Sequence, residues 1–389
     1  MRRLSIPAAL VSLGIVLAAC GASTASGALT SLGDNENQLN LIIWDGYAEK
    51  GAVDPAYDWV TDFQTETGCI VHATPMTDSN NGVSLLNSGQ YDGGSFSGDA
   101  TVRLMAGDKV APVNVDLIPN YKDVFPGLKL KEFNSKGGVP YGVPHGRGPN
   151  LLMWNTNDVT TAPTTWDPIF EGGSDYRDKI SVYDSSIYIA DAALHLMQKN
   201  PDLKITNPYQ LNDAQFAAAI KLLERQRDNG AVYWSLLTDQ VQSFDSGDTV
   251  IGTTWPYQVN LLKAETPPAP VEAVLPNEGS TGWSDTWMIA KNAAHPNCMY
   301  RWMNHIISAQ ANAQATIWFG EAAVTQAACQ AAEAILPGHC TAQHASDEAY
   351  WDKIWYWTTP QVDCADADAA TTCKDQDAWT EAWSTLRGS

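Results

Sequence analysis

Residues 39–73 read LNLIIWDGYAEKGAVDPAYDWVTDFQTETGCIVHA, and they decide the architecture of the chain. The run at 39–44 is apolar and partly β-branched, which predicts a buried strand. Apolar residues then recur at helical spacing over 57–63, and Gly68 supplies a stop signal before a second apolar run at 69–73. A strand, a helix and a strand in this order predict two parallel strands joined by a right-handed crossover.

The same alternation returns in the second half of the chain. A strand is expected at 179–184 and another at 248–255, with an amphipathic helix between them that starts at the N-cap Asn212 and ends before Gly230. Repeated alternation of this kind predicts an α/β fold with open, mostly parallel sheets flanked by helices. Ligands of such sheets bind beyond the carboxyl ends of the strands.

The first twenty residues predict export. Two arginines precede an apolar run that is too short to span a membrane, which is typical of a secretory signal at 1–19. The LAAC that ends it resembles the lipobox of bacterial lipoproteins, so cleavage before Cys20 and a lipid on its sulfur are expected. Residues 20–37 are small and polar, and we expect them to form a flexible tether to the membrane.

Residues 38–389 are expected to form a soluble body on the outer side of the membrane. This body is longer than the segment that one hydrophobic core usually stabilises, so two domains are expected. The protein is expected to be a monomer. The net charge of −21 repels phosphate backbones, which argues against nucleic acid as a partner and favours a cationic ligand.

The seven cysteines comprise one lipid acceptor and six others, an even number in an oxidising compartment. Their spacing makes two short-range disulfides plausible, which would leave a long-range pair, although six cysteines allow fifteen connectivities. The pairs so predicted are Cys329 with Cys340, Cys364 with Cys373, and Cys69 with Cys298.

No motif for catalysis or for a cofactor is present. The sequence has no GxGxxG, GxxxxGK[ST], HExxH or GxSxG, and its seven histidines are dispersed. A zinc site in HCTAQH (339–344) would lack a second ligand pair, and DCADAD (363–368) lacks the glycine and the terminal glutamate of a calcium loop. We therefore expect neither an enzyme nor a metal or cofactor site.

Several segments, taken in order, resemble bacterial extracellular solute-binding proteins of ABC transporters, in particular the spermidine- and putrescine-binding group. The segments are LIIWDGYAEK, YDGGSFSGDATVRLMAGDKVAPV, VPYGVPHGRGPNLLMWN, IGTTWPYQ and LPNEGSTGWSDTWMIAKNAAHPNCMYRWMNHI. The resemblance implies a two-lobed fold of the periplasmic-binding-protein type II class with the ligand in a cleft between the lobes. It assigns 38–146 and 284–325 to lobe one, and 147–283 and 326–389 to lobe two, which puts Cys69 and Cys298 in the same lobe.

The resemblance also implies the ligand site, in which aromatic faces cover a methylene chain and carboxylates meet the ammonium groups. Asp285 lies between two tryptophans in WSDTW (283–287), so its counter-ion is expected to arrive with the solute. The residues implied at the site are Trp44, Tyr47, Ser97, Asp99, Asp184, Tyr188, Trp255, Trp283 and Asp285. The chain departs from the family pattern at Asp99, where an aromatic is usual, and at Ser185 and Tyr188, where acids are usual.

The predicted function is that of a lipid-anchored receptor that delivers a cationic, polyamine-like solute to a membrane ABC permease. A quaternary amine or an amino-acid-like zwitterion is the alternative solute, and Arg147 would favour the zwitterion by binding its carboxylate. A secreted enzyme on the same scaffold is the remote alternative.

Overall fold

The computed structural model describes residues 27–171, 175–364 and 372–388. The predicted signal at 1–19, the lipidated Cys20, the start of the tether and most of the acidic loop at 363–368 lie outside these residues. Within the described ranges, no helix combines the length and the apolar character that crossing a bilayer requires.

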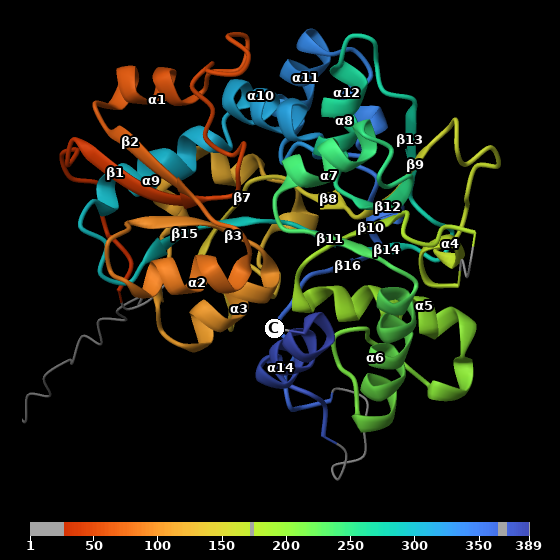
Figure 1. Ribbon diagram of the computed structural model, residues 1–389. Coiled ribbons are helices and arrows are strands. Elements are labelled where there is room, and N and C mark those ends of the chain that lie inside the picture. The colour runs from red at the N-terminus through yellow and green to blue at the C-terminus, as the bar shows by residue number, and fades with distance from the viewer. Residues whose placement is uncertain (1–26, 172–174, 365–371, 389) are drawn as a thin grey trace, which may run out of the picture.

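The first lobe is built on a sheet of six strands (Figure 1). Five strands follow the spatial order β2, β1, β3, β15 and β4, and β7 also pairs with β15. Their bounds are β1 (Gln38–Ile43), β2 (Ile70–Pro75), β3 (Gly93–Phe96), β4 (Val110–Ala111), β7 (Gly142–Pro144) and β15 (Thr286–Ala290). β1 pairs in parallel with β2 and β3, which confirms the parallel pairing predicted from 39–73. β15 arrives from the other lobe and runs antiparallel to its neighbours.

Side chains alternate between the two faces of this sheet, as the period of a strand requires. Leu39 and Leu41 of β1 are buried in one core cluster with α1 and α9, whereas Ile42 is buried in another with α2 and α3. The helices of this lobe are α1 (Val60–Thr67), α2 (Ser79–Asn87), α3 (Gly98–Ala106), α9 (Pro296–Ile306) and α10 (Ala309–Phe319). The sheet is therefore the middle layer between two pairs of helices.

The second lobe is built on a five-stranded sheet in the order β11, β10, β12, β9 and β13. The bounds are β9 (Leu151–Asn155), β10 (Ile180–Tyr183), β11 (Val232–Trp234), β12 (Ile251–Thr254) and β13 (Val271–Val274). The strands predicted at 179–184 and 248–255 are confirmed as β10 and β12, and they pair in parallel. β9 is antiparallel to both of its neighbours. Each sheet is thus parallel in part and antiparallel in part.

Helices surround the second sheet. They are α4 (Asp167–Phe170), α5 (Ile189–Lys199), α6 (Asp213–Asp228), α7 (Leu237–Asp245), α8 (Pro256–Ala264) and α14 (Gln376–Arg387). The predicted N-cap Asn212 is confirmed: its side chain accepts the backbone N–H groups of Ala214 and Gln215, and Gln215 bonds back to the Asn212 N–H. Gly230 follows the helix in a left-handed conformation, as its stop role requires.

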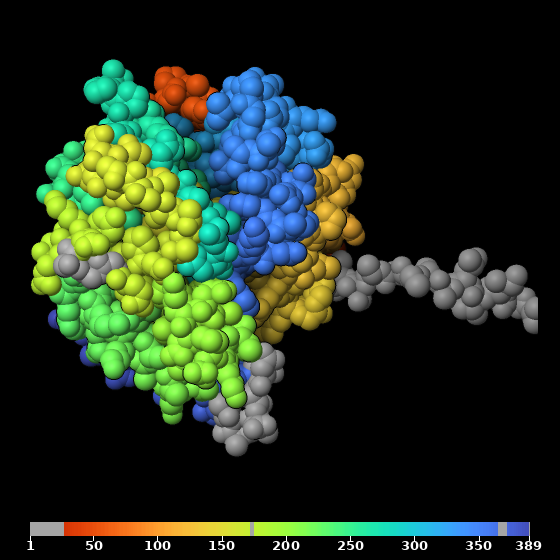
Figure 2. Space-filling view, turned by 90° about the vertical axis from the view of Figure 1, so that its right-hand side faces the viewer, coloured from red at the N-terminus to blue at the C-terminus, as the bar shows by residue number. Residues whose placement is uncertain are grey.

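A small third sheet and a C-terminal segment join the two lobes. The sheet orders β16 (Ile354–Tyr356), β14 (Ser280–Trp283) and β8 (Gly148–Pro149). The C-terminal segment also holds α11 (Gln326–Ile335), α12 (His339–Ala342) and α13 (Glu348–Trp351). Figure 2 shows it in blue, between the orange surface of the first lobe and the yellow and green surface of the second.

The chain crosses between the sheets on short segments that bond to one another. Residues 145–147 link β7 to β8, residues 284–285 link β14 to β15, and residues 320–322 follow α10. The N–H of His145 donates to the Asp285 carbonyl (2.8 Å), and the N–H of Ala322 donates to the Arg147 carbonyl (2.9 Å). These bonded crossings form a hinge region, and the sheets divide as the predicted lobes do, although the lobe boundaries themselves stay a prediction.

The structure contains the three predicted disulfides, which are Cys69–Cys298, Cys329–Cys340 and Cys364–Cys373. The zinc alternative at 339–344 is overturned, because the sulfur of Cys340 is bonded to Cys329.

One predicted helix starts later than its pattern suggested. The helical spacing begins at Tyr57, but α1 begins at Val60. Asp54 instead organises a turn, in which its carboxylate accepts the N–H of Ala56 (2.9 Å) and its carbonyl accepts the N–H of Tyr57 (3.0 Å). The Asx turn competes with the helix for these backbone groups.

Candidate functional site

A small cavity between the lobes brings together six of the nine residues implied at the site. They are Trp44, Tyr47, Ser97, Trp255, Trp283 and Asp285, and Phe319 and Trp357 complete the lining. Three of the six follow directly on strand ends, namely Trp44 after β1, Ser97 after β3 and Trp255 after β12, and Asp285 directly precedes β15. The cavity has a volume of about 10 Å³, which is close to the space of one water molecule. A cavity of this size has no room for a solute larger than water.

The indoles of Trp44, Trp234 and Trp283 surround the indole of Trp255, and these four rings are called the indole box below. The ring centroid of Trp255 lies 6.1 Å from Trp44, 4.9 Å from Trp234 and 6.0 Å from Trp283, and all three contacts are edge-on. Trp283 also contacts Trp357 at 6.1 Å. Aromatic faces of this kind attract cations and pack well against methylene groups.

Asp285 is buried at the polar end of this box, with 2 % of its surface exposed. The hydroxyl of Ser97 donates to one carboxylate oxygen (2.6 Å) and the hydroxyl of Tyr47 is 2.9 Å from the other. No arginine or lysine of the described residues forms an ion pair with it. Asp285 thus has hydroxyl partners but no basic counter-ion in the described part of the chain.

A second buried acid, Glu321, lies on the other side of Tyr47. The Tyr47 hydroxyl is 2.7 Å from Glu321 Oε1, and the indole N–H of Trp283 donates to the same oxygen (2.6 Å). The other oxygen, Oε2, is buried without a hydrogen-bond partner among the described residues. Sequence reasoning missed Glu321, because it follows a helix rather than a strand and is flanked by glycine and alanine.

One hydroxyl proton serves two carboxyl groups in this arrangement. If Tyr47 donates to one acid, its second short contact requires a proton on the other acid. Burial raises the pKa of Asp285 to about 7, against the opposing effect of Ser97 and Tyr47. Burial also raises the pKa of Glu321 to about 8, and the charge of Asp285 adds to that shift. A cation that entered here would take the place of a proton.

Asp184 lines a neighbouring cavity rather than the one that contains Asp285. This second cavity shares Trp44, Trp255 and Trp357 with the first. The carboxylate of Asp184 is already paired. Arg387 donates two hydrogen bonds to it (both 3.1 Å), and the indole N–H of Trp383 donates a third (2.8 Å). Asp184 is therefore neutralised within the protein.

Asp99 and Tyr188 line neither cavity. Asp99 accepts a hydrogen bond from Ser79 (2.8 Å), and burial raises its pKa while Arg103 opposes the rise. Tyr188 is buried in the core of the second lobe, where Gln226 donates to its hydroxyl (3.0 Å). The structure therefore does not bring these two residues to the cavity where Trp283 and Asp285 meet.

Arg147 is also occupied. It is 1 % exposed, donates to Glu348 and to the Ala345 carbonyl (both 3.0 Å), and lies over the ring of Trp351 (4.3 Å). These contacts hold the C-terminal segment against the hinge. The prediction that Arg147 binds a ligand carboxylate therefore lacks structural support.

Indole donors provide the other polar feature of the two cavities. The Nε1 atoms of Trp44, Trp234, Trp255 and Trp357 are buried and have no acceptor among the described residues. Buried donors without partners cost about 1–3 kcal/mol each. A ligand with acceptor atoms would satisfy them.

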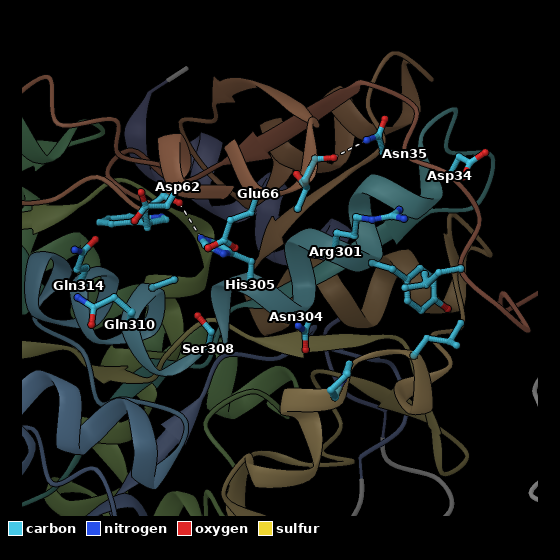
Figure 3. Close-up of a pocket in the computed structure, with 17 residues that line it drawn as sticks. Asp34, Asn35, Asp62, Glu66, Arg301, Asn304, His305, Ser308, Gln310 and Gln314 are labelled. Carbon is cyan, nitrogen blue, oxygen red and sulfur yellow. Dashed lines mark hydrogen bonds between the residues drawn. The ribbon is translucent and has the colours of Figure 1, made fainter. Parts of the chain in front are cut away.

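A larger hollow of about 810 Å³ lies elsewhere on the first lobe (Figure 3). It runs along α1, α9 and the N-terminal segment, and its rim includes Asp62, Glu66, Arg301 and His305. His305 is held in place there by a bond between its Nε2 atom and the Trp59 carbonyl (2.8 Å). A solute in this hollow would touch one lobe only, so its binding would not draw the sheets together.

Residues 58–342 match the family model described as bacterial extracellular solute-binding protein. A spermidine/putrescine-binding periplasmic protein of Haemophilus influenzae is 22 % identical over 285 residues, which cover 72 % of this chain and 73 % of that protein.

Two of the solved structures that share the fold illustrate the similarity. The spermidine/putrescine ABC transporter substrate-binding protein of Streptococcus pneumoniae aligns with a TM-score of 0.67 at 17 % identity, over 90 % of this chain and 97 % of that one. The Tp0655 lipoprotein of Treponema pallidum aligns with a TM-score of 0.67 at 17 % identity, over 90 % of this chain and 100 % of that one.

Proposed function

The chain belongs to the bacterial extracellular solute-binding protein family, the binding components of ABC transporters, and from this membership we propose that it captures a cationic, polyamine-like solute between its lobes. The observation that carries the proposal is the acid pair Asp285 and Glu321. Both are buried at one end of an indole box, they share the Tyr47 hydroxyl, and they lack a basic partner among the described residues. An ammonium group supplies the counter-ion that the protein does not.

Capture requires the lobes to separate and close again, because a cavity of about 10 Å³ admits no polyamine. A solute that contacts Trp44 and Ser97 of the first lobe and Trp255 of the second stabilises the closed form over the open one. The closed form is then the state that the permease recognises. The hinge segments at 145–147, 284–285 and 320–322 carry the motion.

An amino-acid-like zwitterion is the second candidate solute. The unpartnered indole N–H groups of Trp44, Trp234, Trp255 and Trp357 favour it, since they are donors and a carboxylate is an acceptor. Such a ligand would place its ammonium group at Asp285 and its carboxylate among the indoles.

A calorimetric and thermal-shift panel decides between these solutes. It comprises putrescine, spermidine, spermine, choline, betaine, γ-aminobutyrate and basic amino acids, each titrated into the purified protein. A ligand of the folded state raises the melting temperature by mass action. Polyamine binding supports the first candidate and zwitterion binding alone supports the second. If no cation in the panel binds, the proposal is wrong.

The proposal includes lipid attachment at Cys20 and delivery to an ABC permease. Cleavage before Cys20 would leave the tether at 20–37 to hold the body near the outer face of the membrane. Replacement of Cys20 by alanine should move the protein from the membrane fraction to the soluble fraction of the producing cells, as an immunoblot would show.

A further inference from the structure

A cluster of three metal-binding residue types lies in the second lobe, apart from both interlobe cavities. Asp167 is the first residue of α4, His195 lies on α5, and Glu278 belongs to the loop between β13 and β14. One donor atom from each residue lies within 4.8 Å of the other two. The ring of Phe170, also on α4, contacts the His195 ring at 4.9 Å and fixes the imidazole in this position.

The polar atoms of this cluster are buried and poorly partnered. His195 is 0 % exposed, and neither of its ring nitrogens makes a hydrogen bond among the described residues. Glu278 Oε2 is likewise buried without a hydrogen-bond partner, whereas Asp167 Oδ1 is buried against Lys199 in an ion pair. The closest acid to the ring is Glu171, with Oε1 3.5 Å from Nε2. Several orphaned polar atoms that converge on one point indicate that a ligand belongs there.

We propose that Asp167, His195 and Glu278 bind a divalent transition-metal ion of the Zn²⁺ or Mn²⁺ class. One imidazole nitrogen and two carboxylate oxygens suit these borderline ions, and they suit neither soft Cu⁺ nor the all-oxygen preference of Ca²⁺. The ion would join α4, α5 and the β13–β14 loop. Its role is to stabilise the second lobe, and it takes no part in solute binding.

The carboxylates must move for the ion to bind. Two ligands of a tetrahedral Zn²⁺ at about 2.1 Å from the ion are about 3.4 Å apart, so a pair at the 4.8 Å limit must close by about 1.4 Å. Asp167 and Glu278 are partly exposed and can make this movement, whereas His195 stays fixed in the core.

Lys199 is the competitor of the metal ion. Its Nζ atom is 2.6 Å from Asp167 Oδ1 and 2.8 Å from Oδ2. The Lys199 side chain is 41 % exposed and can swing into solvent when the ion arrives. Competition predicts that removal of the lysine charge strengthens metal binding, whereas a purely structural ion pair predicts no metal binding at all.

The test uses the purified protein after treatment with a chelator and dialysis. ZnCl₂ and MnCl₂ are titrated separately in a calorimeter, and the melting temperature is followed with each metal. We expect one saturable site per chain and a rise in melting temperature. Glu278→Gln and Asp167→Asn should each weaken the affinity at least tenfold, and Lys199→Gln should strengthen it severalfold.

The matched control is Glu272→Gln, which removes an acid of β13 that pairs with Lys263 on the surface. This control should leave metal affinity unchanged. His195 is fully buried, so the test relies on the two carboxyl variants, which preserve side-chain volume. The proposal is overturned if no binding saturates at one ion per chain, or if binding survives Glu278→Gln and Asp167→Asn unchanged. In either case Lys199 alone neutralises the cluster.

Discussion

Asp285 is the residue on which cation binding should depend most directly. Asp285→Asn keeps the shape of the side chain and its contacts with Ser97 and Tyr47 while removing the charge. We expect the affinity for a cationic solute to fall more than tenfold, which is about 1.4 kcal/mol or more. Calorimetry with the solute identified by the panel measures the change.

The control for this prediction is Asp184→Asn. Arg387 and Trp383 already occupy the Asp184 carboxylate. Loss of the Asp184 charge should therefore reduce the free energy of unfolding by more than it reduces the free energy of solute binding. Equal loss of affinity in both variants would contradict the distinction between the two acids.

The acid pair also predicts that cation affinity depends on pH. Burial raises the pKa of Asp285 to about 7 and of Glu321 to about 8, and a bound cation favours their anionic forms. Binding must therefore release protons at neutral pH, and affinity should rise from about pH 6 to about pH 9. Calorimetry in two buffers that differ in ionisation enthalpy counts the released protons. An affinity that stays constant over this range would contradict the prediction.

The same pKa values fix the sign of the effect on stability. Between the unfolded and the folded pKa values, each acid of the pair is protonated in the folded protein and ionised in the unfolded chain. Its contribution to the free energy of unfolding of the unliganded protein is therefore greatest at low pH. The contribution is lost as the pH rises from about 4 to about 8.

The residues of the site were only partly predictable from the sequence. Trp44 and Trp255 could be predicted because each lies at the end of an expected strand, and the carboxyl ends of strands define the ligand edge of such sheets. Ser97 was implied by the family resemblance alone. Glu321 follows a helix and has no distinguishing neighbours. The neutralisation of Asp184 depends on Arg387, 203 residues further along the chain, and no local pattern reveals such a contact.

At the scale of elements, the N-terminus of α3 packs directly against the backbone of the C-terminal segment. A Cβ atom at Gly98 would lie 1.7 Å from the carbonyl oxygen of Trp357, and the neighbouring Thr359 hydroxyl donates to the Asp99 carbonyl (2.7 Å). The contact leaves no room for a side chain, so glycine is required for closure.

Gly98→Ala should therefore disfavour the closed form. We expect at least a tenfold loss of solute affinity, because affinity falls with the fraction of molecules that can close. Small-angle scattering with saturating solute should show a larger radius of gyration than for the unsubstituted protein. Gly33→Ala is the control, since a Cβ there meets only ordinary contacts with Asn297 at 3.5 Å. Full affinity in Gly98→Ala would show that this contact does not limit closure.

The elements themselves were largely predictable. β1, β2, β10 and β12 have apolar, β-branched sequences, and α6 carries a complete capping box, so their local signals agree with the fold. The antiparallel strands β9 and β15 were not anticipated, because their direction depends on how the chain returns to each sheet. The start of α1 was misjudged because the Asp54 turn overrides a helical spacing.

At the scale of the whole molecule, the long-range disulfide should contribute more to stability than the short-range ones. In the chain-entropy model, Cys69–Cys298, which spans 229 residues, contributes about 5.5 kcal/mol, and Cys329–Cys340, which spans 11, contributes about 2.8 kcal/mol. The double variant Cys69→Ala/Cys298→Ala should therefore lose about 2.7 kcal/mol more than Cys329→Ala/Cys340→Ala. Urea unfolding of both variants measures the difference, and equal losses would contradict the entropic account.

The position of the Cys69–Cys298 bond also determines what a protease can remove. Every strand of the second sheet lies between the two cysteines in sequence, so the backbone and the disulfide together form one covalent ring. A single cut between residues 70 and 297 opens this ring without detaching a fragment. The nicked protein would migrate as one band on an unreduced gel and as two after reduction. A receptor exposed outside the cell would thus keep both halves of its cleft on one covalent molecule after a first proteolytic event.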